Sequence, residues 1–144
     1  MYSFRKSKKG FTLIELMVVV AIIGVLALLG LRLYTGQQIK AKNAIVKANA
    51  GTVQTLIQAE LADTGSGAVN TMVGAAAADS DLIEASGIHI PDGDAQVTNG
   101  TAAGTVGMVY VVYDATSAGS EFFEINGNAF DGGDVYEEPL TARK

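Results

Sequence analysis

The chain has 144 residues, which is enough for one folded domain with terminal extensions, since domains usually contain about 100–200 residues. It contains no cysteine, which excludes a disulfide framework and a thiolate metal site. The formal net charge of −5 hides an uneven distribution. Fifteen residues are Asp or Glu, and all of them except Glu15 lie between Ala48 and Ala142, where there is no Lys or Arg. Because phosphate binding needs clustered basic residues, we expect no nucleic acid on this acidic body.

The first ten residues form a short basic leader. Four basic side chains stand in it, and it ends at Gly10, immediately before an apolar run. An ordinary secretory signal is cut after its apolar core. Here the change in composition precedes the core, so we expect processing between Gly10 and Phe11, which leaves the apolar run in the mature protein.

The apolar run extends from Phe11 to Leu31, and its only polar side chains are Thr12 and Glu15. As a helix it would be about 31 Å long, close to the thickness of the hydrocarbon core of a bilayer. The positive-inside tendency places the basic leader in the cytoplasm. An ordinary single-pass anchor is the simplest alternative interpretation of this run.

The helical pattern continues beyond the apolar run. Residues 37–62 contain no proline, and apolar side chains recur there at spacings of three, four and seven. These side chains are Ile39, Val46, Ala50, Val53, Ile57 and Leu61. The sequence therefore predicts one long helix from about Phe11 to Ala62, apolar in its first half and amphipathic in its second.

The remainder of the chain predicts a small sheet. Val106 to Asp114 and Glu121 to Asn126 are rich in β-branched and aromatic residues, and turn residues separate them. A third strand is expected near residues 95–98, and a short helix is expected to begin at Ser80 or Asp81. The fold class is therefore α+β, with the helix stripe packed on one face of an antiparallel sheet.

These elements divide the chain into three regions, of which residues 1–10 are the cleaved leader and residues 11–36 the membrane-embedded helix. Residues 37–144 are the soluble domain, and they divide further into the helix continuation (37–62), a loop region (63–93), and the sheet with acidic C-terminal loops (94–144).

The segment from Lys9 to Ala27, KGFTLIELMVVVAIIGVLA, closely resembles the N-terminal signature of bacterial type IV prepilins and of the related type II secretion pseudopilins. The resemblance covers roughly the first 35 residues. It implies cleavage after Gly10 by a prepilin peptidase, N-methylation of Phe11, and assembly of a homopolymer through the apolar helices. Two departures from many type IV pilins are the absence of a proline near Arg32 and the absence of a C-terminal disulfide.

Glu15 is the expected assembly residue. A carboxylate in an apolar helix costs about 2.5–3.5 kcal/mol at the centre of a bilayer and is normally paired. The cut after Gly10 creates an amine on Phe11, and in a growing fibre the resemblance implies that Glu15 attracts the amine of a neighbouring subunit. The alternative is that Glu15 sits at the headgroup boundary without a partner.

The expected function is that of a structural subunit of a pilus-like surface filament, and the expected partners are copies of the chain, the prepilin peptidase, the inner-membrane assembly machinery and, before assembly, lipid. The precursor is expected in the inner membrane and the product in an extracellular filament. Alternatives are a major pseudopilin of a type II secretion system and a membrane-anchored binding module. The sequence offers no catalytic constellation, so we expect no enzyme.

No cofactor is expected, but a calcium site is a secondary hypothesis. Asp131 and Asp134 lie in a glycine-rich turn near the C-terminus, and calcium favours clustered loop oxygens. Such a site would replace the missing disulfide. Asp, Asn and Gly clusters are also typical of ordinary turns, and the spacing differs from that of an EF-hand loop.

Overall fold

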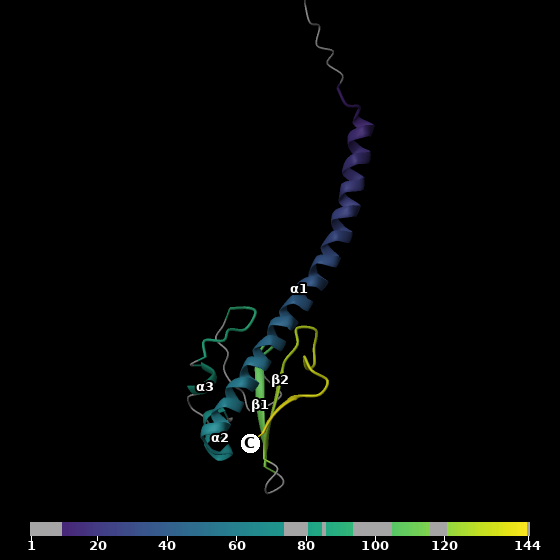
Figure 1. The fold of residues 1–144 in the computed structure, drawn as a ribbon. Helices are drawn as coiled ribbons and strands as arrows, with labels where there is room; N and C mark the ends of the chain where they lie inside the picture. Colours follow the sequence, from purple (N-terminus) through teal and green to yellow (C-terminus); the bar gives the residue numbers. More distant parts are fainter. Residues whose placement is uncertain (1–9, 74–80, 85, 94–104, 116–120, 144) are drawn as a thin grey trace, which may run out of the picture. The chain divides into compact units, whose positions relative to one another are not determined.

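The computed structural model describes residues 10–73, 81–84, 86–93, 105–115 and 121–143. Its chain order is one long helix, two short helices and three strands (Figure 1). The elements are α1 (Leu13–Asp63), α2 (Ser66–Val73), α3 (Asp81–Glu84), β1 (Val109–Asp114), β2 (Phe122–Gly127) and β3 (Leu140–Arg143). The chain divides into two compact units, one ending at Gln37 and one beginning at Gln38.

The first unit contains the N-terminal half of α1. The helix runs through Gly24, Gly30 and Gly36 without interruption, because straight-chain and apolar helix formers surround these glycines. Every residue from Gly10 to Lys40 is exposed in the single chain. The predicted long helix is confirmed, and its observed bounds differ from the prediction by two residues at the start and one at the end.

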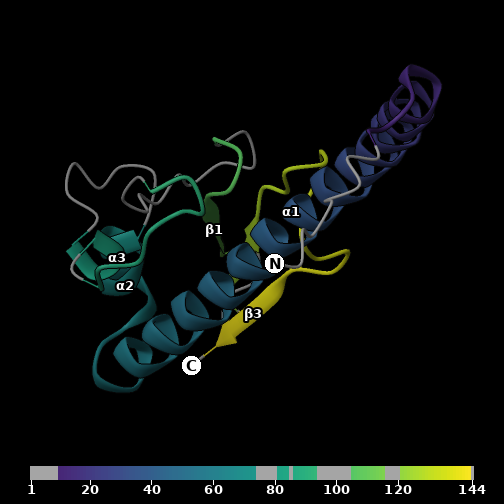
Figure 2. The same ribbon diagram turned by 90° about the horizontal axis from the view of Figure 1, so that it is seen from above.

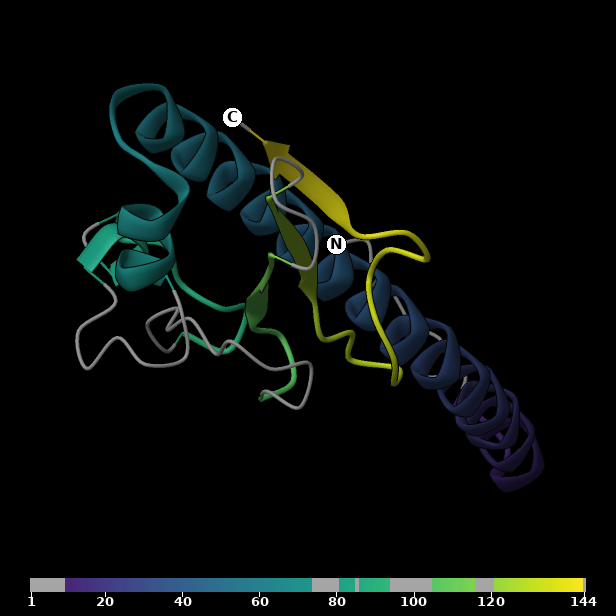
Figure 3. The same cartoon turned by 90° about the horizontal axis from the view of Figure 1, so that it is seen from below.

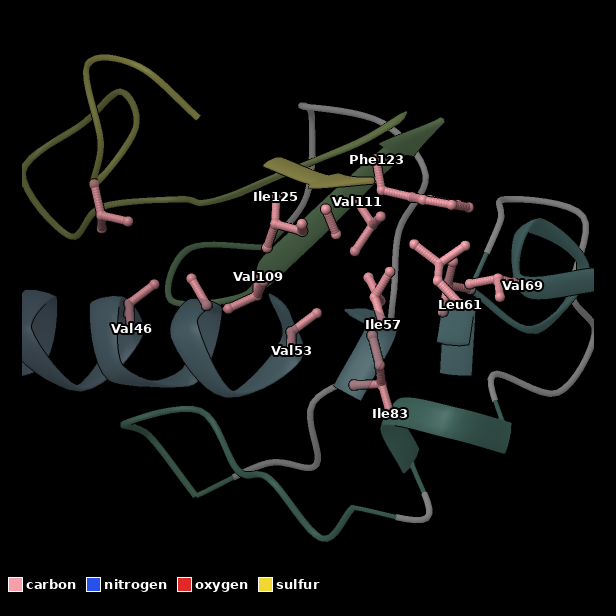
Figure 4. Close-up of a cluster of buried hydrophobic side chains, with 14 of the residues drawn as sticks. Val46, Val53, Ile57, Leu61, Val69, Ile83, Val109, Val111, Phe123 and Ile125 are labelled. Carbon is pink, nitrogen blue, oxygen red and sulfur yellow. The ribbon is translucent and has the colours of Figure 1, made fainter. Parts of the chain in front are cut away.

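The second unit is organised around a stripe on the C-terminal half of α1. Its five buried side chains are Val46, Ala50, Val53, Ile57 and Leu61. Figure 4 shows Val46, Val53, Ile57 and Leu61 of this stripe directed at the sheet, where they meet Val109, Val111, Phe123 and Ile125 of the same core. Burying one such side chain stabilises the fold by about 1.5–3 kcal/mol. The prediction of a helix stripe packed on an antiparallel sheet is therefore confirmed, except that Ile39, which was predicted as part of the stripe, is 36% exposed.

The sheet has three antiparallel strands in the order β1-β2-β3. Val111 pairs with Ile125, and Ile125 pairs in turn with Leu140. β3 runs beside α1, as Figure 2 shows. Gln58 of α1 bonds both backbone groups of Arg143, and Gln54 donates to the Thr141 carbonyl at 2.8 Å. These amides occupy the outer edge of β3, an edge that would otherwise invite pairing with another chain.

The structure confirms two of the three predicted strands. β1 and β2 lie within one to three residues of their predicted bounds, but β3 was not predicted, because four residues after Pro139 carry too little pattern. The strand expected near residues 95–98 lies outside the described residues. The described sheet therefore owes its third strand to a segment that was expected to be a loop.

The region of residues 63–93 was predicted as a loop with one short helix, and this was wrong in part. It contains α2 as well as α3, and both are seen beside the C-terminal end of α1 in Figure 3. α2 forms because Val69 and Val73, four residues apart, share one helix face and join the core with Ile83 of α3. The observed start of α3 at Asp81 agrees with the prediction.

The C-terminal loop, residues 128–139 between β2 and β3, is held by side-chain amides. Asn126 is 2% exposed, and its amide group donates to the Tyr136 carbonyl at 2.9 Å. Its oxygen accepts from the amides of Gly127 and Tyr136. Asn43 of α1 fixes the tip, since it accepts from the Phe130 amide and donates to Asp131, each at 2.9 Å.

Glycines shape the same loop at two kinds of position. Gly132 and Gly133 have φ values of 95° and 82°, which L side chains rarely adopt. Gly127 is needed for a different reason, because a Cβ there would collide with the Val46 side chain. The loop can therefore approach α1 closely without a disulfide.

We predict that Asn126→Ala lowers the free energy of unfolding by about 2–4 kcal/mol, because it takes their partner from the buried amide of Gly127 and from the part-buried backbone groups of Tyr136. Denaturant unfolding of the full chain in detergent measures this, and hydrogen exchange should show faster exchange at the Tyr136 amide. Asn128→Ala is the matched control in the same loop, because the Asn128 amide nitrogen is buried without a partner. Equal losses of unfolding free energy in the two variants would show that the hydrogen bonds of Asn126 do not hold the loop.

Candidate assembly site at the start of the apolar helix

The first turn of α1 is closed by a pair of polar side chains. Thr12 precedes the helix, and its hydroxyl accepts from the Glu15 amide at 3.3 Å. The Glu15 carboxylate accepts in return from the Thr12 amide at 2.8 Å and from the Thr12 hydroxyl at 2.7 Å. This reciprocal arrangement is a capping box, which satisfies helix amides that have no partner within the helix.

The capping box gives Glu15 a role that was not predicted. The carboxylate was expected to pair with the amine of another subunit, yet in the single chain it already accepts two hydrogen bonds from Thr12. A negative charge in the first turn is also favoured by the helix dipole. The spacing Thr-x-x-Glu before an apolar run is the signal in the sequence that identifies Thr12.

The predicted processing residues lie next to this turn. Gly10, Phe11, Thr12 and Glu15 line one hollow of about 450 Å³. The Phe11 side chain is 91% exposed, and a Cβ added to Gly10 would meet nothing within 4 Å. The fold of the described residues therefore imposes no requirement for glycine at this position.

The helix that follows is long and apolar enough to cross a membrane. Its most apolar window of 18 residues has a mean hydropathy of 2.8, and none of that window is buried. Ile14, Val19 and Leu29 are 70%, 51% and 57% exposed. At about 25 cal/mol per Å² of apolar surface, exposure of this half to water is strongly unfavourable, so another apolar phase has to cover it.

The structure places the two candidate calcium ligands at the rim of a different hollow, of about 340 Å³, between α1 and the C-terminal loop. Asp131 accepts from Asn43, and Asp134 accepts from the Tyr110 hydroxyl. Burial and this bond to Asp134 raise the pKa of Tyr110 to about 12.

Lys40 and Lys47 line the same hollow, and no group of three or more His, Asp or Glu side chains gathers in the part of the chain that the structure describes. Calcium binding at Asp131 and Asp134 stays a hypothesis.

Comparison with known proteins agrees with the geometry of the N-terminus. Residues 5–31 match the family model described as the prokaryotic N-terminal methylation motif. The type IV major fimbrial protein FimA of Dichelobacter nodosus is 34% identical over 122 residues, which are 85% of this chain and 74% of FimA. The chain belongs to the type IV pilin family. The fimbrial protein EcpB of Eikenella corrodens is 47% identical over 58 residues, which are 40% of this pilin and 36% of EcpB. No solved structure gives a significant match.

Membership of this family gives the protein the role of a structural subunit of a pilus. The pilin signature and the apolar N-terminal helix together account for a subunit that assembles into multimeric filaments. A secretion pseudopilin and an anchored binding module are not favoured, because the relatives that match are fimbrial proteins.

We predict that Thr12→Val loosens the first turn of α1, because valine keeps the shape of threonine and removes the hydroxyl that closes the capping box. Losing a cap costs about 1 kcal/mol, so the Glu15 amide should exchange its hydrogen about fivefold faster. Hydrogen exchange followed by NMR on the full chain in micelles measures this. Thr12→Ser should restore slow exchange, and unchanged exchange in Thr12→Val would show that the capping box does not hold the turn.

Proposed function

We propose that this pilin is made as an inner-membrane precursor, cut after Gly10 by a prepilin peptidase and methylated on Phe11. The inner-membrane assembly machinery then adds it to a homopolymer that leaves the cell as a surface filament. Lipid covers the apolar half of α1 before assembly, and other copies of that half cover it afterwards.

The observation that carries this proposal is a single carboxylate, Glu15, at the start of an apolar helix that no described residue of the chain covers. From Phe11 to Leu31 the described chain has no other ionisable side chain and no buried residue. An apolar helix by itself would suit any anchor. A carboxylate four residues from the new amine is what distinguishes an assembly element from an anchor.

Glu15 has the geometry for a second partner. Its bonds to Thr12 both use one carboxylate oxygen, Oε2, so Oε1 can accept from an amine outside the chain. In a filament, the Phe11 amine of another copy would supply that donor. A charge pair buried among packed helices is strongly destabilised when one partner is removed, so it can set the register between copies.

We predict that Glu15→Ala abolishes filaments, because the incoming amine would be buried without its counter-charge. Electron microscopy of sheared surface material, with mass spectrometry of its main protein, measures this. The wild type should yield fibres whose subunit begins at methylated Phe11. Glu15→Gln should also fail, since it keeps an acceptor for Thr12 and loses the charge.

Asp63→Ala is the matched control, because it removes an exposed carboxylate from the other end of α1. Its fibres should equal those of the wild type in number. If Glu15→Ala still makes normal fibres, Glu15 is not an assembly determinant. If the wild-type protein stays in the membrane with residues 1–10 attached, the proposed function is wrong.

We predict that Gly10→Val blocks processing and leaves the fold intact, because a Cβ at Gly10 meets no atom of the described residues within 4 Å, whereas the site of a peptidase would exclude it. Mass spectrometry of the N-terminus measures processing, and thermal unfolding of the full chain measures the fold. Gly24→Ala serves as the control, since its Cβ is equally unhindered and lies beyond the cut. Normal removal of residues 1–10 from Gly10→Val would contradict cleavage by a glycine-selective peptidase.

A further inference from the structure

Three lysines lie close together on α1 in the second unit, and they are not equivalent. Lys42 pairs with Asp92 at 2.6 Å and also lies 4.6 Å from the centre of the Phe130 ring. It is the only lysine or arginine of the described residues with a carboxylate within 4.0 Å. Lys42 is therefore used within its own chain to hold two loops against the helix.

Lys40 and Lys47 are exposed, and neither has a carboxylate of the described residues within 4.0 Å. They are seven residues apart, so they stand on the same side of α1 at a rise of about 10 Å. Both line the hollow of about 340 Å³ beside the C-terminal loop, and Ala44 lies between them. Lys47 lies 5.4 Å from the centre of the Tyr136 ring, which orients its side chain without neutralising it.

The opposite wall of this hollow is negative but already occupied by hydrogen bonds. Asp131 accepts from Asn43, and Asp134 accepts from Tyr110. An incoming carboxylate would be repelled from this wall and drawn to the lysines on the helix. The negative wall and the positive lysines therefore fix the direction from which an acidic group can approach.

The rest of the chain determines which acidic partner is available in a homopolymer. Between Ala48 and Ala142 there are only acidic charges, so copies packed side by side repel one another. Lys40 and Lys47 are the exposed cations of the second unit that lie before this acidic body. A carboxylate of a second copy at these lysines would remove part of that repulsion.

We propose that Lys40 and Lys47 form a docking surface for the acidic body of a second copy of this chain. The proposal rests on the proposed function, since it requires a filament, and it adds an ionic contact between the folded units to the contact between apolar helices. The interface is head-to-tail in type, because a basic surface on one copy meets an acidic surface on the next.

Carbodiimide cross-linking of purified wild-type filaments tests this, because the reagent joins an ammonium group to a carboxylate in direct contact. Dimers separated on a denaturing gel are digested and analysed by mass spectrometry. We expect Lys40 or Lys47 joined to an Asp or Glu of residues 48–142 in the dimer band. The link between Lys42 and Asp92 is the internal control, and it should appear in the monomer band.

The double variant Lys40→Gln and Lys47→Gln should lower the dimer yield about fivefold, in keeping with the modest strength of exposed ion pairs. Lys42→Gln should leave the dimer yield unchanged and remove only the link to Asp92. Raising the salt concentration before cross-linking should lower the wild-type yield, since exposed charges are screened within about 10 Å at 0.1 M.

Wild-type filaments that give dimers without Lys40 or Lys47 would overturn the docking surface and leave the pilin assignment standing. An unchanged dimer yield in the double glutamine variant would overturn it as well. If no filament begins at Phe11, the docking surface and the proposed function fail together. Thermal unfolding of the full-length variants in detergent confirms that a lower yield does not come from a misfolded second unit.

Discussion

The folded unit depends on the packing of one helix stripe against three short strands. β1, β2 and β3 have only four to six residues each, and small sheets of this kind are marginal in water without a covering element. The stripe of Val46, Ala50, Val53, Ile57 and Leu61 supplies that cover. Before Gln38 no described residue covers the same helix, and its large apolar side chains are exposed. The C-terminal half of α1 therefore buries its apolar side chains within its own chain, whereas the N-terminal half needs lipid or other copies to bury them.

The C-terminal loop between β2 and β3 is long, and side-chain contacts fix it in place of a disulfide. Asn126 binds the loop at Tyr136, where a buried amide satisfies backbone groups that no strand reaches. Asn43 binds the loop tip to α1, and Lys42 and Lys47 place cations over the aromatic rings beside it. A set of such contacts is cooperative, because each one restricts the loop for the next.

The sequence predicted what depends on local pattern. The stripe on α1 and the β-branched runs of β1 and β2 are visible from spacing alone, because burial acts at a period of 3.6 or 2. β3 is not visible, since its four residues become a strand only between β2 and the glutamines of α1. α2 was missed because Gly67 lowers its local propensity, and Val69 and Val73 stabilise it only through the core. In the candidate site Glu15 was found from its charge, whereas Thr12 was missed, although the spacing Thr-x-x-Glu is a sequence signal for a capping box.

Charge and apolar packing act at different stages in this molecule. The acidic body keeps separate copies apart, and that repulsion reaches only about 10 Å at 0.1 M salt. Removal of apolar surface from water favours packing of the N-terminal helices without fixing how far one copy slides along another. Directional contacts have to fix that distance, and the chain offers few of them outside its own fold. The roles proposed for Glu15 at the helix start and for Lys40 and Lys47 beside the C-terminal loop would both fix this distance, one from each unit of the chain.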